Sequence, residues 1–557
     1  MQPEEFIIRS PNQLSEKLTG SWDAIVIGSG MGGMACAAAL AKYGARVLIF
    51  EQHYVAGGFT HTFTRKGFKW DVGVHCIGEM GQGDLPGEIL RWLSNNEIQM
   101  KQMSPIYETF HFPDGFEITF PDSRREFQKN LEKAFPDDKA AIAKYFKLVR
   151  DVVRSSKVYF GLKAMPEIVD RVLSKTLFRS GRRYWGITTQ EVLDEITDNE
   201  KLKTVLTGQW GYYGSLPSES SFGIHALTTR HFWNGGYYPV GGAEVIANSL
   251  LKTVGKSGGQ ICLRSPIEKV IVKNGKAVGV RTVGGDEFFA PKIISATGVN
   301  NTVQKLLPNE YRQTSWGVEL SSLKQSPSYV CLNLGFEGDI LAVGATVSNQ
   351  WFFKTWSMED EVWNIENPDD EIPIIYLSFP SLKDPHHDPG PKMRNTGEAV
   401  TFVPWKAFEK WKNTRRGKRD PDYLEFKKTV EDRILRQLRK LIPAIMDKMV
   451  YHELSTPLSA SFFTQAPRGA IYGLEATPRR FTSFRLRTRT PIKNFYLAGG
   501  DVGTLGVTGA MLGGVLSAGT INYRVLSQLV GVKRQNRPVE VSDQVPVKVL
   551  GGKESYK

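Results

Sequence analysis

The fold of this chain is decided by residues 23–58, DAIVIGSGMGGMACAAALAKYGARVLIFEQHYVAGG. A fully apolar tetrapeptide at its start predicts a parallel strand that is buried on both faces. The strand leads into G-x-G-x-x-G at Gly28, Gly30 and Gly33, and an alanine-rich helix follows. A second apolar strand then ends at Glu51, 23 positions after the first glycine. Strand, glycines, helix, strand and acid together predict a dinucleotide-binding unit.

Each part of this unit has a physical reason. Gly28 allows a tight turn, Gly30 lets the backbone approach a pyrophosphate, and Gly33 lets helix and strand pack closely. The helix N-terminus offers free N–H groups and the positive end of its dipole to phosphates. Glu51 can accept hydrogen bonds from ribose hydroxyls. A tight turn in an ordinary α/β domain is the alternative, but it requires only the glycines.

The residues after Glu51 go beyond the bare fingerprint. Ala56-Gly57-Gly58 and His61-Thr62-Phe63 follow it, and then comes D-x-G-x-H-x-I-G at 71–78. In these motifs the chain resembles the family of FAD-dependent phytoene desaturases, carotenoid isomerases and all-trans-retinol 13,14-reductases (retinol saturases). It is most similar to the saturase branch.

A second block near the C-terminus carries the same resemblance. A strand at 494–498 ends in Gly499-Gly500-Asp501, and residues 506–514 open a helix of small residues. In the family this block closes over the flavin ring, so the resemblance spans roughly residues 20–530. It implies FAD as cofactor, with contacts from Gly28, Gly30, Met31, Gly32, Gly33, Glu51, Gln52, Gly57, Gly58, Phe59, Thr60, Val270 (through its backbone), Gly500, Asp501, Thr508, Gly509 and Ala510.

One position departs from the desaturases. They often carry arginine directly after the glycine pair, where it can contact the diphosphate, and here that position is Phe59. The saturase branch also lacks the arginine, so the change favours that branch and leaves the source of phosphate neutralisation open.

The expected fold is mixed α/β, with a Rossmann-like FAD-binding domain of the glutathione-reductase and amine-oxidase type. An interleaved substrate domain of mixed sheet and helices completes it. We expect the FAD-binding domain at 22–80, 240–300 and 485–530, the substrate domain at 81–239 and 301–484, and a polar tail at 532–557.

Three features of the substrate domain bear on its ligand. Residues 107–120 predict a β-hairpin around Pro113-Asp114-Gly115. Residues 124–210 are expected to be helical, and their basic, aromatic part at 157–183 is either a membrane-facing segment or a lid with a solvated face. Aromatic residues crowd 210–239, where they either line an apolar ligand site or pack the core.

The composition of the chain limits the kinds of partner that it is expected to bind. The chain has 557 residues, a net charge of +13 and four cysteines without metal-ligand spacing. No helix-turn-helix, zinc-finger or RNP-type pattern supports nucleic acid. The first 20 residues hold no apolar signal segment, and no run is long enough to span a membrane. We expect a cytoplasmic protein, with peripheral membrane contact as an option and the oligomeric state open.

The resemblance implies an oxidoreductase that acts on a carbon–carbon double bond of a long apolar isoprenoid, such as a retinoid or carotenoid. Saturation by hydride from reduced flavin is the reaction that we expect, with NADPH as an option for the electron donor. His75 is the candidate for proton transfer, and a satisfied core histidine is the alternative. A desaturase, an isomerase and a lipid chaperone similar to the GDP-dissociation inhibitors are rival functions.

No metal is expected. The histidine–aspartate cluster at 384–388 lies among prolines, which place it in a turn-rich loop.

Overall fold

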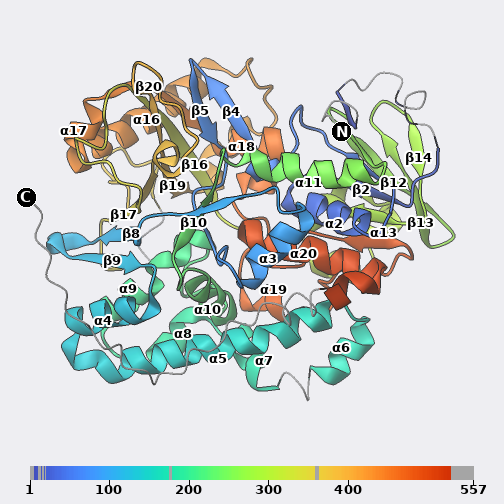
Figure 1. Ribbon diagram of the computed structural model, residues 1–557, viewed down its shortest axis with the longest axis horizontal. Coiled ribbons are helices and arrows are strands. Elements are labelled where there is room, and N and C mark those ends of the chain that lie inside the picture. Colours follow the sequence, from blue (N-terminus) through green and yellow to red (C-terminus); the bar gives the residue numbers. More distant parts are fainter. Residues whose placement is uncertain are drawn as a thin grey trace, which may run out of the picture.

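The structure is a computed structural model, and it combines several sheets with helices between and around them (Figure 1). It describes residues 6–9, 14, 18, 20–174, 179–357 and 363–528. The expected polar tail at 532–557 lies outside these residues. The mixed α/β fold class is confirmed.

A parallel sheet of six strands holds the dinucleotide-binding unit. Its order is β1-β11-β3-β2-β15-β21. The strands are β1 (Ile7–Ile8), β11 (Gln260–Cys262), β3 (Val47–Phe50), β2 (Ala24–Ile27), β15 (Ile293–Ser295) and β21 (Phe495–Leu497). Every residue of β2 and β3 is buried, as expected for central parallel strands covered on both faces. The C-terminal β21 therefore lies in the same sheet as the N-terminal motif.

Helices cover one face of this sheet and a smaller sheet lies toward the other. Val26, Ile49 and Ile294 pack with α2 (Met31–Ala41), α11 (Glu244–Lys256) and α20 (Gly506–Ile521). Their neighbours Ile25 and Leu48 point the opposite way, as side chains alternate along a strand. On that side lies the antiparallel sheet of β12 (Ile267–Lys273), β13 (Lys276–Thr282) and β14 (Glu287–Phe289). Helices α2 and α20 thus stand side by side on one face.

A mixed sheet of seven strands forms the second large layer, in the order β20-β16-β19-β18-β17-β8-β9. Its strands are β20 (Met449–Ser455), β16 (Ser328–Phe336), β19 (Asn395–Val403), β18 (Ile374–Ser378), β17 (Asn349–Phe353), β8 (Ile106–His111) and β9 (Glu117–Pro121). The predicted hairpin is confirmed as β8 and β9, which pair antiparallel around Asp114 at φ +62°. Only β8 and β17 run parallel.

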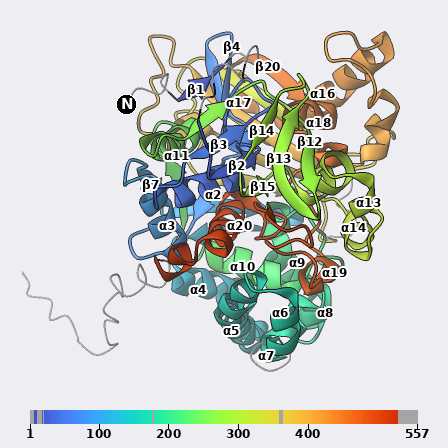
Figure 2. The same ribbon diagram turned by 90° about the vertical axis from the view of Figure 1, so that its right-hand side faces the viewer.

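Helices cover both faces of this second sheet. The predicted helical segment forms α4 (Arg124–Ala134), α5 (Lys139–Lys163), α6 (Glu167–Leu173), α7 (Arg179–Trp185), α8 (Thr189–Asp194) and α9 (Glu200–Thr207), and α10 (Phe222–His231) follows. The opposite face packs against α16 (Pro421–Leu441) and α17 (Pro443–Met446). Figures 1 and 2 place α5, α6 and α7 at the lower end and α16 at the upper end.

Shorter elements complete the fold. Two small sheets are β4 (Thr62–Arg65) with β5 (Phe68–Asp71), and β6 (Ile77–Gly78), β10 (Gly236–Pro239) and β7 (Met100–Gln102). The remaining α-helices are α3 (Leu85–Leu93), α12 (Val299–Asn301), α13 (Asn309–Arg312), α14 (Ser315–Ser321), α15 (Pro380–Lys383), α18 (Pro457–Thr464) and α19 (Pro478–Thr482). Within the described ranges, none of the helices combines the length and apolar character that crossing a bilayer requires.

Candidate active site

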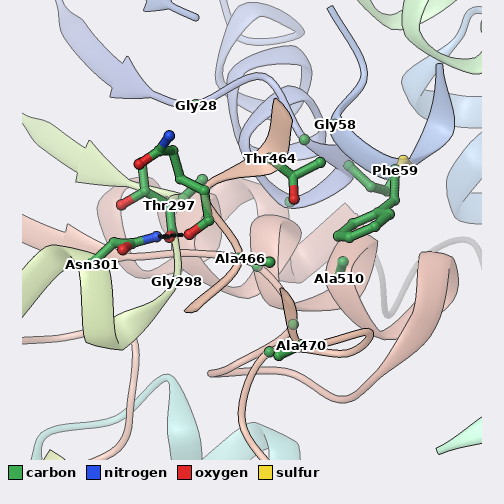
Figure 3. Close-up of a pocket in the computed structure, with 18 of the residues that line it drawn as sticks. Gly28, Gly58, Phe59, Thr297, Gly298, Asn301, Thr464, Ala466, Ala470 and Ala510 are labelled. Carbon is green, nitrogen blue, oxygen red and sulfur yellow. Dashed lines mark hydrogen bonds between the residues drawn. The ribbon is translucent and has the colours of Figure 1, made fainter. Parts of the chain in front are cut away.

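A cavity of about 410 Å³ lies between the parallel sheet and the seven-stranded sheet. Figure 3 shows Thr297 and Asn301 on one side of it and Phe59 on the other. Twelve predicted cofactor residues line it: Gly28, Gly30, Met31, Gly32, Glu51, Gln52, Gly58, Phe59, Thr60, Gly500, Asp501 and Ala510. The two ends of the chain therefore meet at one cavity. The predicted residues outside its lining are Gly33, Gly57, Val270, Thr508 and Gly509.

Two of these five support the loops around the cavity. A Cβ on Gly33 would lie 2.0 Å from the carbonyl oxygen of Gly28, so this glycine lets helix and strand pack closely. The Gly57 amide donates to the Ser29 carbonyl at 3.2 Å. This bond holds the second glycine segment against the first.

The other three lie farther from the open space. Val270 is buried in β12, in the core between the small sheet and the parallel sheet. A Cβ on Gly509 would lie 2.2 Å from Thr504 Oγ1, so this glycine is a packing residue of α20. Thr508 is half-buried on the same helix. Contact of these three residues with the cofactor stays a prediction.

Glu51 stands at the end of β3 with its carboxylate in the cavity wall. Oε2 accepts from the Ser29 amide at 2.9 Å and from Ser29 Oγ at 2.7 Å, and Oε1 accepts from the His53 amide at 2.8 Å. These donors hold the carboxylate in place, and each oxygen keeps acceptor capacity for a ribose hydroxyl. The position fits the ribose-binding role that the motif predicts.

Lys305 is the lysine that lines the cavity, and no arginine joins it among the described lining residues. Burial lowers the pKa of its ammonium, and Nζ donates to Gln465 Oε1 at 3.3 Å. Phe59 also lines the cavity, in the position where desaturases carry arginine. Sequence reasoning missed Lys305, because the range 301–484, in which it lies, was assigned to the substrate domain.

Asp501 ties three chain segments together at the cavity wall. Its Oδ2 accepts from the Val299 amide at 2.7 Å and its Oδ1 accepts from the Leu474 amide at 3.0 Å. Arg480 donates to the carbonyls of Leu474 and Gly500, each at 2.5 Å. The aspartate therefore shapes the wall, and its predicted role beside the cofactor remains open.

His75 lines the cavity close to a carboxylate that the sequence did not point out. Its Nδ1 lies 2.9 Å from Glu398 Oε2, and its ring stands edge-on to Tyr376 with 5.1 Å between centroids. Glu398 is 1% exposed, and neither of its oxygens has a hydrogen-bond partner among the described residues. The contact is therefore an ion pair when the imidazole is protonated. The available signal was a carboxylate inside the otherwise uncharged strand β19.

Lys383 fixes the backbone behind His75. Its buried Nζ donates to the His75 carbonyl at 2.8 Å, to Ser378 Oγ at 2.6 Å and to Asn349 Oδ1 at 2.5 Å. Burial lowers the pKa of this ammonium to about 8. Three polar partners and nearby carboxylates offset part of the cost of burying the charge.

Glu108 extends the buried polar region away from the cavity. Its carboxyl accepts from Tyr212 Oη at 2.6 Å, from Gln209 Nε2 at 2.9 Å and from Trp351 Nε1 at 2.5 Å. Burial raises the pKa of this carboxyl to about 7. The helical segment and the seven-stranded sheet are thus joined by a titratable group.

The apolar part of the cavity wall comes from the seven-stranded sheet. Tyr329 and Cys331 of β16 and Val400 of β19 line it, and Tyr472 lies beside them. The aromatic residues at 210–239 do not line it, and Trp210, Tyr213, Phe222 and Tyr238 are almost fully buried. The core-packing interpretation of that segment is therefore confirmed. The wall that could face an apolar ligand is the sheet.

The polar groups of the loop at 384–388, where no metal is expected, form hydrogen bonds with the protein itself. Asp384 Oδ1 accepts from the amides of Gly241 and His386, each at 2.9 Å, and His387 Nε2 lies 2.8 Å from the Arg394 carbonyl. No group of three potential metal ligands occurs among the residues that the structure describes.

The geometry of the site and the family that the chain matches together define a flavin-dependent oxidoreductase. The cavity combines an open glycine cradle, the buried carboxylate of Glu51 and the N-terminus of α2. The family of flavin-containing amine oxidoreductases matches residues 31–522, so the chain belongs to that family. The residues present fit FAD. A Cβ built on Gly30 would meet nothing within 4 Å, so the space beside this glycine is open to a pyrophosphate.

Individual relatives agree with the family. The chain is 33% identical over 543 residues to the all-trans-retinol 13,14-reductase of Danio rerio, covering 92% of this chain and 88% of the relative. It is 27% identical to the chloroplastic prolycopene isomerase of Daucus carota, covering 86% and 76%. Among solved structures, cyclohexylamine oxidase from Brevibacterium oxydans superposes with a TM-score of 0.57 at 16% identity, covering 93% and 99%. The resemblance and the cofactor inferred from the sequence are confirmed.

Proposed function

We propose that this protein saturates a carbon–carbon double bond of a long apolar isoprenoid, such as a retinoid or carotenoid. The observation that carries the proposal is the His75–Glu398 pair beside the apolar wall. Reducing a double bond consumes a proton as well as a hydride, and this pair offers a proton next to a wall that suits a hydrocarbon chain. The relatives named as a reductase and an isomerase of isoprenoids support the substrate class.

Each part of the site has its own role in the proposed reaction. FAD, when bound, supplies the hydride. Glu51 and the glycine cradle hold the cofactor at the ends of β2 and β3. His75 holds the proton for the second carbon, and Glu398, whose Oε2 lies 2.9 Å from Nδ1, orients the imidazole. Tyr329 and Cys331 exclude water from the side of the sheet.

The rival functions differ in hydrogen balance. A desaturase removes two hydrogens, and an isomerase leaves their number unchanged. The prolycopene isomerase relative keeps isomerisation as the second candidate. Membership in a flavin family disfavours the non-catalytic lipid chaperone. The electron donor is a separate proposal, with NADPH as the candidate that the sequence left open.

We further propose that α6 contacts a membrane surface. Ile168 and Val172 lie one turn apart and are 72% and 62% exposed, and Met165 is 44% exposed. Arg171 on the same helix is partly exposed and pairs with Glu167. Apolar side chains beside basic ones favour the interface of an anionic bilayer. Figures 1 and 2 place α6 at the lower edge of the molecule.

The proposed reaction is tested by product mass. The FAD-loaded protein is reduced with dithionite without oxygen, and all-trans-retinol or a carotene is added. A product heavier by two hydrogens supports saturation. An unchanged mass with a new double-bond geometry would establish the isomerase. A loss of two hydrogens in a parallel incubation with FAD left oxidised, which accepts the two electrons, would establish the desaturase.

A further inference from the structure

A second cavity opens beside the first. It has a volume of about 310 Å³ and lies among β4, β16, β20, α18 and the start of α16. Residues that line both cavities are His53, Phe59, His61, Val72, Tyr329, Cys331, Phe463 and Thr464. Because these residues are shared, a ligand beside the flavin site has a neighbouring space on the far side of Phe59 and Phe463.

Basic side chains gather in the lining of this second cavity. We name Arg416, Arg419 and Lys427 the basic rim, and all three line the cavity. Arg65 lines it too, but lies 3.9 Å from the carboxylate of Glu453, which is also in the lining. The lining therefore carries four lysine and arginine cations against one carboxylate.

The basic rim has no acidic partner in the described part of the chain. The guanidinium of Arg416 stacks on Phe463 at 4.6 Å, and that of Arg419 lies 4.7 Å from the ring of Tyr423. Arg419 Nη1 donates to Tyr423 Oη at 3.1 Å, while its buried Nε has no hydrogen-bond partner. N–H groups of the basic rim therefore remain available to donate hydrogen bonds to an anion.

The carboxylate of Asp422, near the start of α16, is engaged elsewhere. It accepts from Trp411 Nε1 at 3.0 Å and pairs with Lys410 at 3.1 Å. It does not line the cavity. The charged side chains that line the cavity are therefore mostly cationic.

The deeper wall of this cavity suits a hydrocarbon. Its apolar lining residues are Phe59, Phe63, Val72, Leu454, Ala460 and Phe463. Polar groups there bond to one another: Asn333 Nδ2 donates to the Glu453 carbonyl at 3.1 Å, and the hydroxyls of Tyr423 and Thr456 lie 2.9 Å apart. A dinucleotide needs polar partners along its length, whereas an amphiphile needs an apolar wall and a charged end. The lining matches the amphiphile.

We propose that the second cavity binds the anionic end group, a carboxylate or phosphate, of an isoprenoid whose chain extends into the first cavity. Arg416, Arg419 and Lys427 hold the end group, and the aromatic residues shared by the two cavities contact the chain. The inference rests on the proposed function and adds its substrate class: an isoprenoid acid or phosphate in preference to a neutral alcohol.

Paired ligands test this inference. Calorimetry on the FAD-loaded full chain measures the binding of all-trans-retinoate and all-trans-retinol, which share a chain and differ in charge. Arg416→Gln with Arg419→Gln, and Lys427→Gln alone, remove rim charges. Lys428→Gln is the matched control, because Lys428 neighbours Lys427 on α16, is exposed and does not line the cavity.

The expected result is a loss of retinoate affinity of about tenfold or more in the double variant, since charge-assisted bonds to the anion are removed. Retinol affinity should change less than twofold, and Lys428→Gln should change neither. Unchanged retinoate binding, or an equal loss for both ligands, would overturn the anionic site and leave the proposed reaction standing. NADPH is titrated as a third ligand, and a tenfold loss confined to NADPH would overturn the inference in favour of a dinucleotide. Failure of the wild type to bind either retinoid would contradict the proposed substrate class as well.

Discussion

Glu398 Oε2 lies 2.9 Å from His75 Nδ1 at the cavity wall, and the carboxylate is buried to 1% exposure. A buried carboxylate without hydrogen bonds is costly unless a positive charge stands beside it. The imidazole of His75 is therefore held beside the apolar wall by a buried carboxylate. Loss of either partner should affect proton delivery.

Replacing His75 by glutamine should lower turnover by about 10²-fold or more, because a general acid is lost. Retinol affinity should hold. Stopped-flow reoxidation of the reduced flavin by retinol measures the step. A His75→Gln protein with full turnover would remove this residue from the mechanism.

Glu398→Gln should act through the histidine. Because Glu398 Oε2 lies 2.9 Å from Nδ1 and holds the imidazole in place, its removal should lower the turnover, though by less than the loss of His75 does. Single-turnover reoxidation of the flavin in Glu398→Gln, His75→Gln and the wild type measures this order. A Glu398→Gln protein that is as fast as the wild type would remove the carboxylate from the mechanism.

Replacement of Gly30 and of Gly32 by alanine should have different effects on stability and on FAD binding. A Cβ on Gly32 would lie 2.2 Å from Gly499 Cα, so Gly32→Ala should destabilise the packing of α2 against the C-terminal block. Gly30 has φ −61°, and a Cβ there points into open space, so Gly30→Ala should fold normally and lose FAD. Thermal unfolding and flavin absorbance measure both effects. A flavin-loaded Gly30→Ala protein would contradict the placement of the pyrophosphate.

Glu108 should make stability depend on pH. Burial raises the pKa of its carboxyl in the folded state from 4.5 to about 7, so the folded protein binds the proton more tightly. The contribution of Glu108 to the free energy of unfolding is complete below pH 4.5 and is lost as the pH rises through 7. In total it is on the order of 3 kcal/mol. Glu108→Gln should flatten this decline in urea unfolding between pH 5 and 8. Replacing the exposed Glu425 by glutamine is the control and should retain the slope.

Charges on α6 should abolish membrane contact. Ile168→Glu with Val172→Glu places carboxylates on the exposed apolar face. We expect co-sedimentation with liposomes that contain phosphatidylserine to fall to background, with turnover on detergent-solubilised retinol unchanged. Val283→Glu, at an exposed position on a distant turn, should still co-sediment. If all three proteins bound liposomes alike, α6 would not be the contact surface.

The sequence predicted local features well and long-range contacts poorly. The first βαβ unit and the hairpin at 107–120 were recognisable, because their spacing and turn residues are local. Glu398, Lys383 and Lys305 were not, since they reach the site through sheet pairing and loops far along the chain. Val270 and Thr508 were assigned by resemblance, and the structure puts them outside the cavity lining.

The central claim is tested most directly by a single turnover without oxygen. The FAD-loaded protein is reduced and mixed with one equivalent of all-trans-retinol, and the absorbance of oxidised flavin and of the polyene is recorded together. The account predicts that oxidised flavin returns at the rate at which polyene absorbance is lost, with one retinol saturated per flavin. Flavin that stays reduced while the polyene is unchanged or only isomerised would contradict it.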